Sequence, residues 1–322
     1  DFTAGVKQPD GAGYSHSWAP SVDSRLGAQI SADLTSQLSA TLQVIAEQQW
    51  DKSYRPQIEW VNVKYAFTPD LSVRLGRTIL PLFLISDTRK VGFASPMIRP
   101  SGEIFRMLSI TSLDGVDVSY TFRADGVKNT TIAFFGKHDE ILPVFNSIHA
   151  NAGGIVNNST YGAATFHIGY LKAKGTVPDI VATPVPAISA LGDHAPISTL
   201  TLGASYDPGN WFASAEWVKG KADLMGRQSA WTVNAGYRLG DFTPYASYSR
   251  LKQDEPSLLL NVAQSTTAVG VRWDAMKNTD VKLQYERISA RDGTAGIFAN
   301  VQPGFANAPK ANVISVAVDF VF

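Results

Sequence analysis

The five histidines are the first residues to examine for chemistry, because histidine is the commonest metal ligand and a frequent catalytic base. They are His16, His138, His149, His167 and His194. Their spacing lacks the i,i+4 pair of a helical metal site. The chain also has no cysteine to supply a thiolate. The sequence therefore predicts no metal site and no cofactor.

A hydrolytic site would need a nucleophile, a base and an orienting group within hydrogen-bond distance. His167 lies near Thr165 on a predicted strand, which keeps a hydrolase open as an alternative. No GxSxG elbow occurs, and GKHDE at 136–140 is typical of a strand that ends in a polar loop. AGGIVNN at 152–158 lacks the helix that a phosphate-binding glycine loop requires. We therefore predict that the protein is not an enzyme and has no catalytic residues.

The segment from Arg77 to Met107 carries a clear local charge. Its basic residues are Arg77, Arg89, Lys90, Arg99 and Arg106, and its acidic residues are Asp87 and Glu103, so five minus two gives +3. The whole chain, in contrast, balances 28 basic against 28 acidic side chains. No global field favours nucleic acid as a partner. Any electrostatic function must be local.

Polar and apolar residues alternate with period two along most of the chain, which predicts half-buried strands. The clear segments are 25–34, 38–47, 59–67, 71–77, 115–122, 198–206, 229–238, 266–273, 281–287 and the C-terminal stretch; weaker ones are 2–7, 129–138, 152–158, 162–173, 211–220 and 242–251. This pattern predicts about sixteen strands, with one helix candidate within 178–192. No apolar run is long enough for a transmembrane helix, whereas transmembrane barrel strands escape a hydropathy search because only alternate residues meet lipid.

Aromatic residues gather next to the predicted short turns, such as TPD at 68–70 and GD at 240–241. The predicted girdle comprises Tyr65, Phe67, Tyr120, Phe122, Tyr237, Trp273, Phe320 and Phe322. A soluble β-sandwich also alternates, but it has no reason to collect aromatic residues at one rim. Such a belt is expected at a lipid interface. We expect Phe322 in it, with its strand closing the sheet against the first strand.

Two stretches resemble the Gram-negative outer-membrane porins. NVISVAVDFVF ends on Phe like the terminal strand of that family, a feature that the family uses as an assembly signal. VRLGRTILPLF, a long segment and SLDGVDVSYTF resemble the porin order of a strand ending in Gly-Arg, an infolded third loop and a strand opening on Asp-Gly. The likeness spans essentially the whole chain. It implies an all-β transmembrane antiparallel barrel of about 16 strands, a single domain over 1–322 with a constriction loop at about 79–108.

The resemblance also implies a pore-constriction site. Arg77 would belong to the basic wall of the constriction, with Arg74 and Lys64 as neighbours on the pore side. Arg89, Lys90 and Arg99 either line the constriction or point outward to solvent, and both readings stay open. The full predicted set is Arg77, Arg74, Lys64, Arg89, Lys90, Arg99, Arg106, Asp87 and Glu103. This loop is poorer in acids than that of the general porins, so its +3 charge favours anions.

The function implied is passive diffusion of small hydrophilic solutes, with a lean toward anions such as small carboxylates. The resemblance places the protein in the outer membrane of a Gram-negative bacterium, as a homotrimer in contact with outer-membrane lipid and lipopolysaccharide. The alternatives are a barrel-embedded hydrolase and a non-conducting structural or adhesive outer-membrane protein.

Overall fold

The computed structural model describes residues 18–49, 51–108, 110–140, 148–176, 195–223, 225–257, 261–298 and 310–322. Within these residues, fifteen strands form one sheet in which each strand pairs antiparallel with the next along the chain. The strands are β1 (Arg25–Asp33), β2 (Leu38–Glu47), β3 (Gln57–Ala66), β4 (Leu71–Ile79), β5 (Ser112–Ala124), β6 (Val127–Glu140), β7 (Ile148–Tyr161), β8 (Ala164–Thr176), β9 (Ala195–Tyr206), β10 (Trp211–Ala222), β11 (Gly226–Tyr237), β12 (Phe242–Gln253), β13 (Gln264–Met276), β14 (Thr279–Ala290) and β15 (Lys310–Phe320). Two short helical turns, η1 (Gly92–Ala94) and α1 (Gly102–Phe105), lie between β4 and β5.

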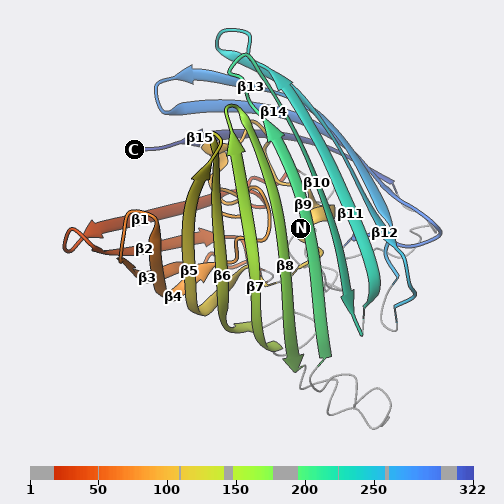
Figure 1. Cartoon of the computed structure of the whole chain (residues 1–322). Helices are drawn as coiled ribbons and strands as arrows, with labels where there is room; N and C mark the ends of the chain where they lie inside the picture. The colour runs from red at the N-terminus through yellow and green to blue at the C-terminus, as the bar shows by residue number, and fades with distance from the viewer. Residues whose placement is uncertain are drawn as a thin grey trace.

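The sheet curves around a hollow, which confirms the predicted all-β antiparallel barrel (Figure 1). Its two edges within the described residues are β1 and β15. The strand predicted at 2–7, which would close the barrel against the C-terminal strand, and the helix candidate within 178–192 both fall outside the described residues.

Short and long connections alternate, as the sequence predicts. The turns at 34–37, 67–70 and 207–210 follow odd-numbered strands and therefore share one end of the sheet, which we call the short-turn end. At Asp125 and Gly126 the turn has two residues with φ of 50° and 78°, the left-handed pair that a tight hairpin favours. The opposite end, called the loop end, carries the 80–111 connection, but β10 and β11 are joined there by a short link.

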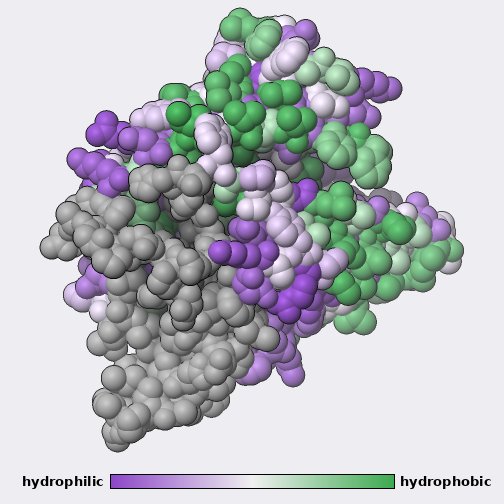
Figure 2. Space-filling model, turned by 180° about the vertical axis from the view of Figure 1, so that it is seen from behind, coloured by the Kyte–Doolittle hydropathy of each residue, from purple (hydrophilic) through white to green (hydrophobic). Residues whose placement is uncertain are grey.

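The two faces of the sheet differ in chemistry. On β14, Leu283 and Tyr285 are exposed on the outer face, while Lys282, Gln284 and Glu286 are buried on the inner face. Figure 2 shows hydrophobic residues gathered over large parts of the outer surface. A sandwich would bury its apolar face instead, so the sandwich alternative is wrong. No helix in the described residues is long and apolar enough to cross a membrane.

The aromatic residues of the predicted girdle are all exposed near the short-turn end, from Tyr65 at 39% to Phe322 at 98%. Several sit in pairs; the rings of Phe242 and Trp273, for example, stack with centroids 6.0 Å apart across β12 and β13. Their contact with a lipid interface stays a prediction.

Candidate functional site

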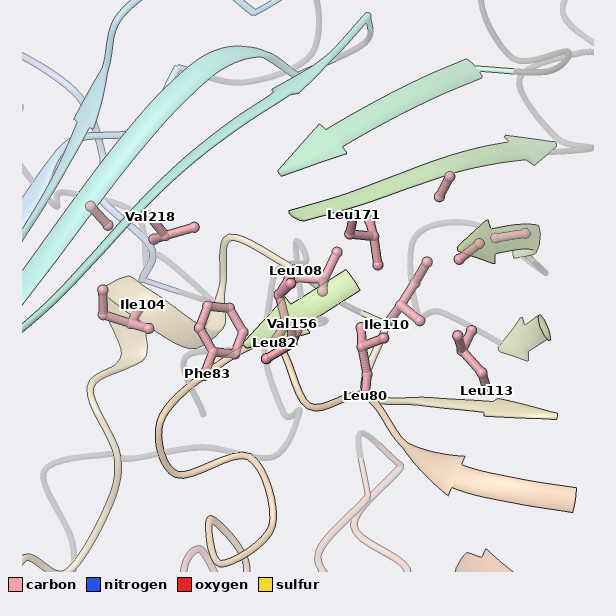
Figure 3. Packing of buried hydrophobic residues seen from close by; sticks show 14 of the residues in the cluster. Leu80, Leu82, Phe83, Ile104, Leu108, Ile110, Leu113, Val156, Leu171 and Val218 are labelled. Carbon is pink, nitrogen blue, oxygen red and sulfur yellow. The ribbon is translucent and has the colours of Figure 1, made fainter. Parts of the chain in front are cut away.

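Residues 80–111, called the inner loop from here on, fold into the hollow of the sheet (Figure 1). Their apolar side chains pack against the wall in one buried cluster (Figure 3) that contains Leu80, Leu82, Phe83, Ile104, Leu108 and Ile110 from the loop, and Leu113, Val156, Leu171 and Val218 from the strands. Burial of one such side chain contributes about 1.5–3 kcal/mol. The infolded loop with an apolar anchor, predicted from LPLFL, is confirmed.

Two wall residues hold the start of the inner loop through its backbone. The ring Nε2 of His167 lies 2.9 Å from the carbonyl oxygen of Leu82. The backbone N–H of Leu84 donates to Oε1 of Glu216 at 2.8 Å. Gly203 allows this approach, because a Cβ atom there would lie 2.8 Å from the side chain of Leu84. His167 is therefore a structural partner of the loop.

The basic pair Arg89 and Lys90 points at the barrel wall. Arg89 donates to Glu59 at 2.8 Å, and Lys90 donates to Glu47 at 2.7 Å and to Glu59 at 2.9 Å. The outward reading is therefore wrong for Arg89 and Lys90, and their place in the lining of the constriction stays a prediction. Glu59 escaped the sequence analysis because a bulge between β2 and β3 at Gln43 breaks the simple alternation there.

Arg99 and Glu103 are also bound to the wall. Arg99 pairs with Glu286, with Asp23 at 2.7 Å and with the hydroxyl of Ser315 at 2.6 Å. Glu103 is 1% exposed. Its carboxylate accepts hydrogen bonds from the hydroxyl of Ser249 at 2.6 Å, from the side-chain amide of Gln264 at 2.8 Å and from the hydroxyl of Thr266. Both residues fasten the loop in place.

The tip of the inner loop at η1 rests on a buried charge network, called the tip anchor. Lys282 Nζ donates to the carbonyl of Gly92 at 2.8 Å and to Asp319 at 2.7 Å. Arg272 donates to the carbonyl of Phe93 at 2.6 Å. Asp280 lies 3.4 Å from Lys282, and both side chains are 0% exposed. Alternation along β13, β14 and β15 places Arg272, Lys282 and Asp319 on the inner face, but it does not show that they bind the loop.

Lys64 and Arg74 remain on the inner wall as predicted neighbours, directly opposite each other on β3 and β4. Arg74 is paired with Asp117 at 3.0 Å. Lys64 is exposed and makes no ion pair with a described acid. Arg106 of the loop has no hydrogen-bond partner at Nε among the described residues. Burial lowers the pKa of Arg106 to about 10, so the side chain stays charged at pH 7.

The structure places Arg77 outside the predicted pore-constriction site. Arg77 is opposite Val61 on β3 and Asp114 on β5, and it binds Asp114 through contacts of 2.6 and 2.7 Å. Val61 is 46% exposed, and Leu75, two residues before Arg77, is 66% exposed, which identifies this as the outer face. Arg77 therefore does not face the constriction, and the prediction needs correction there.

Asp87 is an acid of the inner loop whose side chain is exposed to solvent. Desolvation by the surrounding protein raises the pKa of Asp87 above its ordinary value of 3.8, against an opposing effect of Arg74. A raised pKa favours the protonated acid in the folded state, so its stabilisation is complete below the ordinary value and is lost as pH rises through the raised one. Asp87→Asn should therefore stabilise the protein at pH 7 and give no comparable gain at pH 3. Denaturant midpoints of both proteins at both pH values test this; an equal gain at the two pH values would contradict it.

The remaining histidines make local contacts. His138 lies 2.9 Å from the carbonyl of Ser112, and His149 lies 2.6 Å from Asp139. His16 and His194 fall outside the described residues. The described part of the chain contains no group of three or more His, Cys, Asp or Glu residues that could hold a metal ion.

A family model described as Gram-negative porin matches residues 3–321. No curated protein matches the sequence as a relative.

Solved structures share the fold at low sequence identity. An anion-selective porin from Comamonas acidovorans is 16% identical, covering 94% of this chain and 89% of its own, with a TM-score of 0.58. OmpF of Salmonella typhi, in complex with daunomycin, is 14% identical, covering 91% and 89%, with a TM-score of 0.61. OmpT of Vibrio cholerae is 14% identical, covering 92% and 89%, with a TM-score of 0.58.

Proposed function

The chain belongs to the Gram-negative porin family, which makes it an outer-membrane β-barrel channel protein, and from this premise we propose its transport properties. Residues 1–322 form a single transmembrane barrel domain. The barrel passes small hydrophilic solutes by passive diffusion, without a cofactor and without catalysis. The observation that carries this proposal is the inner loop, which enters the hollow of the barrel and is held there by contacts with Glu59, Glu216 and Lys282. A loop held in this way narrows the diffusion path through the barrel and stays in one position.

The channel prefers anions such as small carboxylates. The +3 charge of the loop does not by itself explain this preference. Wall acids neutralise Arg89, Lys90 and Arg99. The positive potential instead rests on Lys64, which has no ion pair with a described acid, and on Arg106, while Glu103 accepts hydrogen bonds from the wall. Fixed charges at a constriction set selectivity because ions pass close to the wall. An anion-selective porin shares this fold, which is consistent with the proposal.

The assembly is a homotrimer whose outer surface meets outer-membrane lipid and lipopolysaccharide. The support for a trimer is an OmpT structure from Vibrio cholerae described as a trimer form. Cross-linking in native membranes, followed by electrophoresis, should give a band of three chains. A predominant single-chain species would overturn this assignment.

Liposome swelling tests the transport proposal against a closed barrel or a barrel-embedded enzyme. Proteoliposomes should swell in small sugars and in carboxylate salts, and the rate should fall as the solute grows. Empty liposomes are the control for leakage. Absence of swelling from correctly folded protein would overturn the channel, because a barrel plugged by its inner loop gives none.

A charged side chain placed on the outer face should destabilise the barrel. Leu75→Arg places a guanidinium among lipid chains on β4 and should lower the free energy of unfolding by about 2–4 kcal/mol. Ser72→Arg, on the inner face of the same strand, is the matched control and should cost much less. Unfolding in lipid vesicles by denaturant measures both. Equal costs would mean that this face does not meet lipid.

A further inference from the structure

Two unpaired charges of opposite sign lie on the inner side of the barrel. Lys64 on β3 is exposed on the inner face, and it has no hydrogen bond or ion pair with a described residue. Asp87 of the inner loop is also exposed, and it has neither kind of contact within the described part of the chain. Arg89 and Lys90, in contrast, are paired with wall acids, and Glu103 is held by hydrogen bonds. Lys64 and Asp87 are therefore free to act on a passing solute.

Arg74 neighbours both of these charges. It is directly opposite Lys64 in the register of β3 and β4, where Cβ atoms are about 5 Å apart. Desolvation raises the pKa of Asp87, and the guanidinium of Arg74 opposes this rise, so the two groups interact electrostatically. Arg89, two residues after Asp87, is tethered to Glu59 on β3, which keeps Asp87 near the same wall. We call Lys64, Arg74 and Asp87 the lumen site.

The guanidinium of Arg74 keeps hydrogen-bond donors for a solute. Its Nε donates to both carboxylate oxygens of Asp117 at 3.0 Å, and Asp117 is 2% exposed. The two terminal nitrogens of Arg74 make no hydrogen bond with any residue that the structure describes. Asp117 therefore balances the charge of Arg74 but leaves N–H groups whose geometry suits the two oxygens of a carboxylate.

Short polar residues surround the lumen site on the side of the short-turn end. Ser39 is opposite Lys64 on the inner face, and Ser72 precedes Arg74 by two residues on β4. Ser119 on β5 is opposite Ser72. A solute held at Lys64 and Arg74 therefore meets small hydroxyl side chains on these strands.

We propose that the lumen site binds small amino acids as zwitterions, with the carboxylate on Lys64 and Arg74 and the ammonium on Asp87. One free charge of each sign favours a solute that carries both charges. A simple carboxylate is attracted by Lys64 but repelled by Asp87, and a simple amine meets the reverse. The inference rests on the proposed channel function, and it names the carboxylates that the channel favours.

Asp87→Asn tests the ammonium contact. Swelling of proteoliposomes is measured in alanine and in glycerol, an uncharged solute of similar size. Wild type should swell faster in alanine, and Asp87→Asn should lower the alanine-to-glycerol ratio by about fivefold, the factor for one unit charge at about 4 Å in water. Asp70→Asn, in the short turn between β3 and β4, is the matched control and should keep the wild-type ratio. An unchanged ratio in Asp87→Asn would overturn the proposal; misfolding does not explain a loss, because this variant is expected to be the more stable protein at pH 7.

A charge swap tests whether the two groups act as a pair. Lys64→Asp alone and Asp87→Lys alone each leave two like charges at the lumen site, so both should lower the alanine-to-glycerol ratio. The double variant has one charge of each sign again and should exceed both single variants, with alanine bound in the reverse direction. A double variant no better than the single variants would overturn the pairing.

Glycerol separates a failure of this site from a failure of the channel. A closed barrel gives no swelling in either solute, whereas a channel without the lumen site swells in glycerol and shows no preference for alanine. The second result in wild type would overturn the lumen site and leave the proposed channel standing.

Discussion

Lys282→Met should destabilise the barrel by about 1–3 kcal/mol and raise the single-channel conductance. The substitution removes one of the two cations beside Asp280, which is 0% exposed, and leaves Arg272, 3.2 Å away, as the other. Asp280 is then a buried charge that has lost part of its compensation. The substitution also removes the hydrogen bond from Lys282 to the carbonyl of Gly92 that holds the loop tip. A loop tip freed from the wall widens the path. Denaturant unfolding and planar-bilayer recording measure the two effects.

Two companion variants define the cause. Lys64→Met removes an exposed wall lysine without touching the tip anchor, so its stability should stay near that of wild type. Lys282→Met leaves Asp280 and Asp319 with Arg272 as the remaining cation of the tip anchor; adding Asp280→Asn removes the excess negative charge and should restore part of the stability but not the tip contact. Wild-type conductance and stability in Lys282→Met would show that the tip anchor does not hold the loop.

Lys64→Glu should shift ion selectivity toward cations by about fivefold or more in the permeability ratio. A unit charge 4 Å from a passing ion contributes about 1 kcal/mol even at the dielectric constant of water, and about 1.4 kcal/mol corresponds to tenfold. Lys64 is exposed on the inner wall beside Arg74 and has no described acidic partner, so its full charge acts on the lumen. Salt-gradient reversal potentials measure the ratio.

Arg287→Glu is the matched control for this charge reversal, because its side chain lies on the outer face of β14. It changes the net charge of the chain by the same amount and should leave selectivity unchanged. The effect of Lys64→Glu should also shrink at high salt, as screening shortens the reach of the wall charge. Equal shifts in the two variants would locate the selectivity outside the constriction.

The alternation of polar and apolar residues made the barrel predictable. The same alternation assigns the side chain of Arg77 to the outer face. Leu71, Val73, Leu75 and Arg77 share one phase of β4, which is the outer face, while Arg74 lies in the opposite phase. The family resemblance placed Arg77 at the constriction against this phase, and the structure supports the phase. Where motif likeness and strand periodicity disagree, the period of two is the stronger physical constraint.

The contacts of the inner loop could not be predicted in the same way. Arg99 meets Glu286, 187 residues further along the chain, and Lys90 meets Glu47 on β2. A loop has no period that fixes where its side chains point. Its +3 charge was countable from sequence, but the wall acids that neutralise it become partners only when the barrel closes around the loop.

The reversal potential of the purified protein in a planar bilayer, measured across a salt gradient, tests the central claim most directly. We predict stepwise ohmic conductance with a potential of the sign that anion preference requires, because Lys64 and Arg106 carry the positive charge of the constriction. Cation preference would contradict the assignment of these residues. No conductance from a correctly folded barrel would contradict the channel itself.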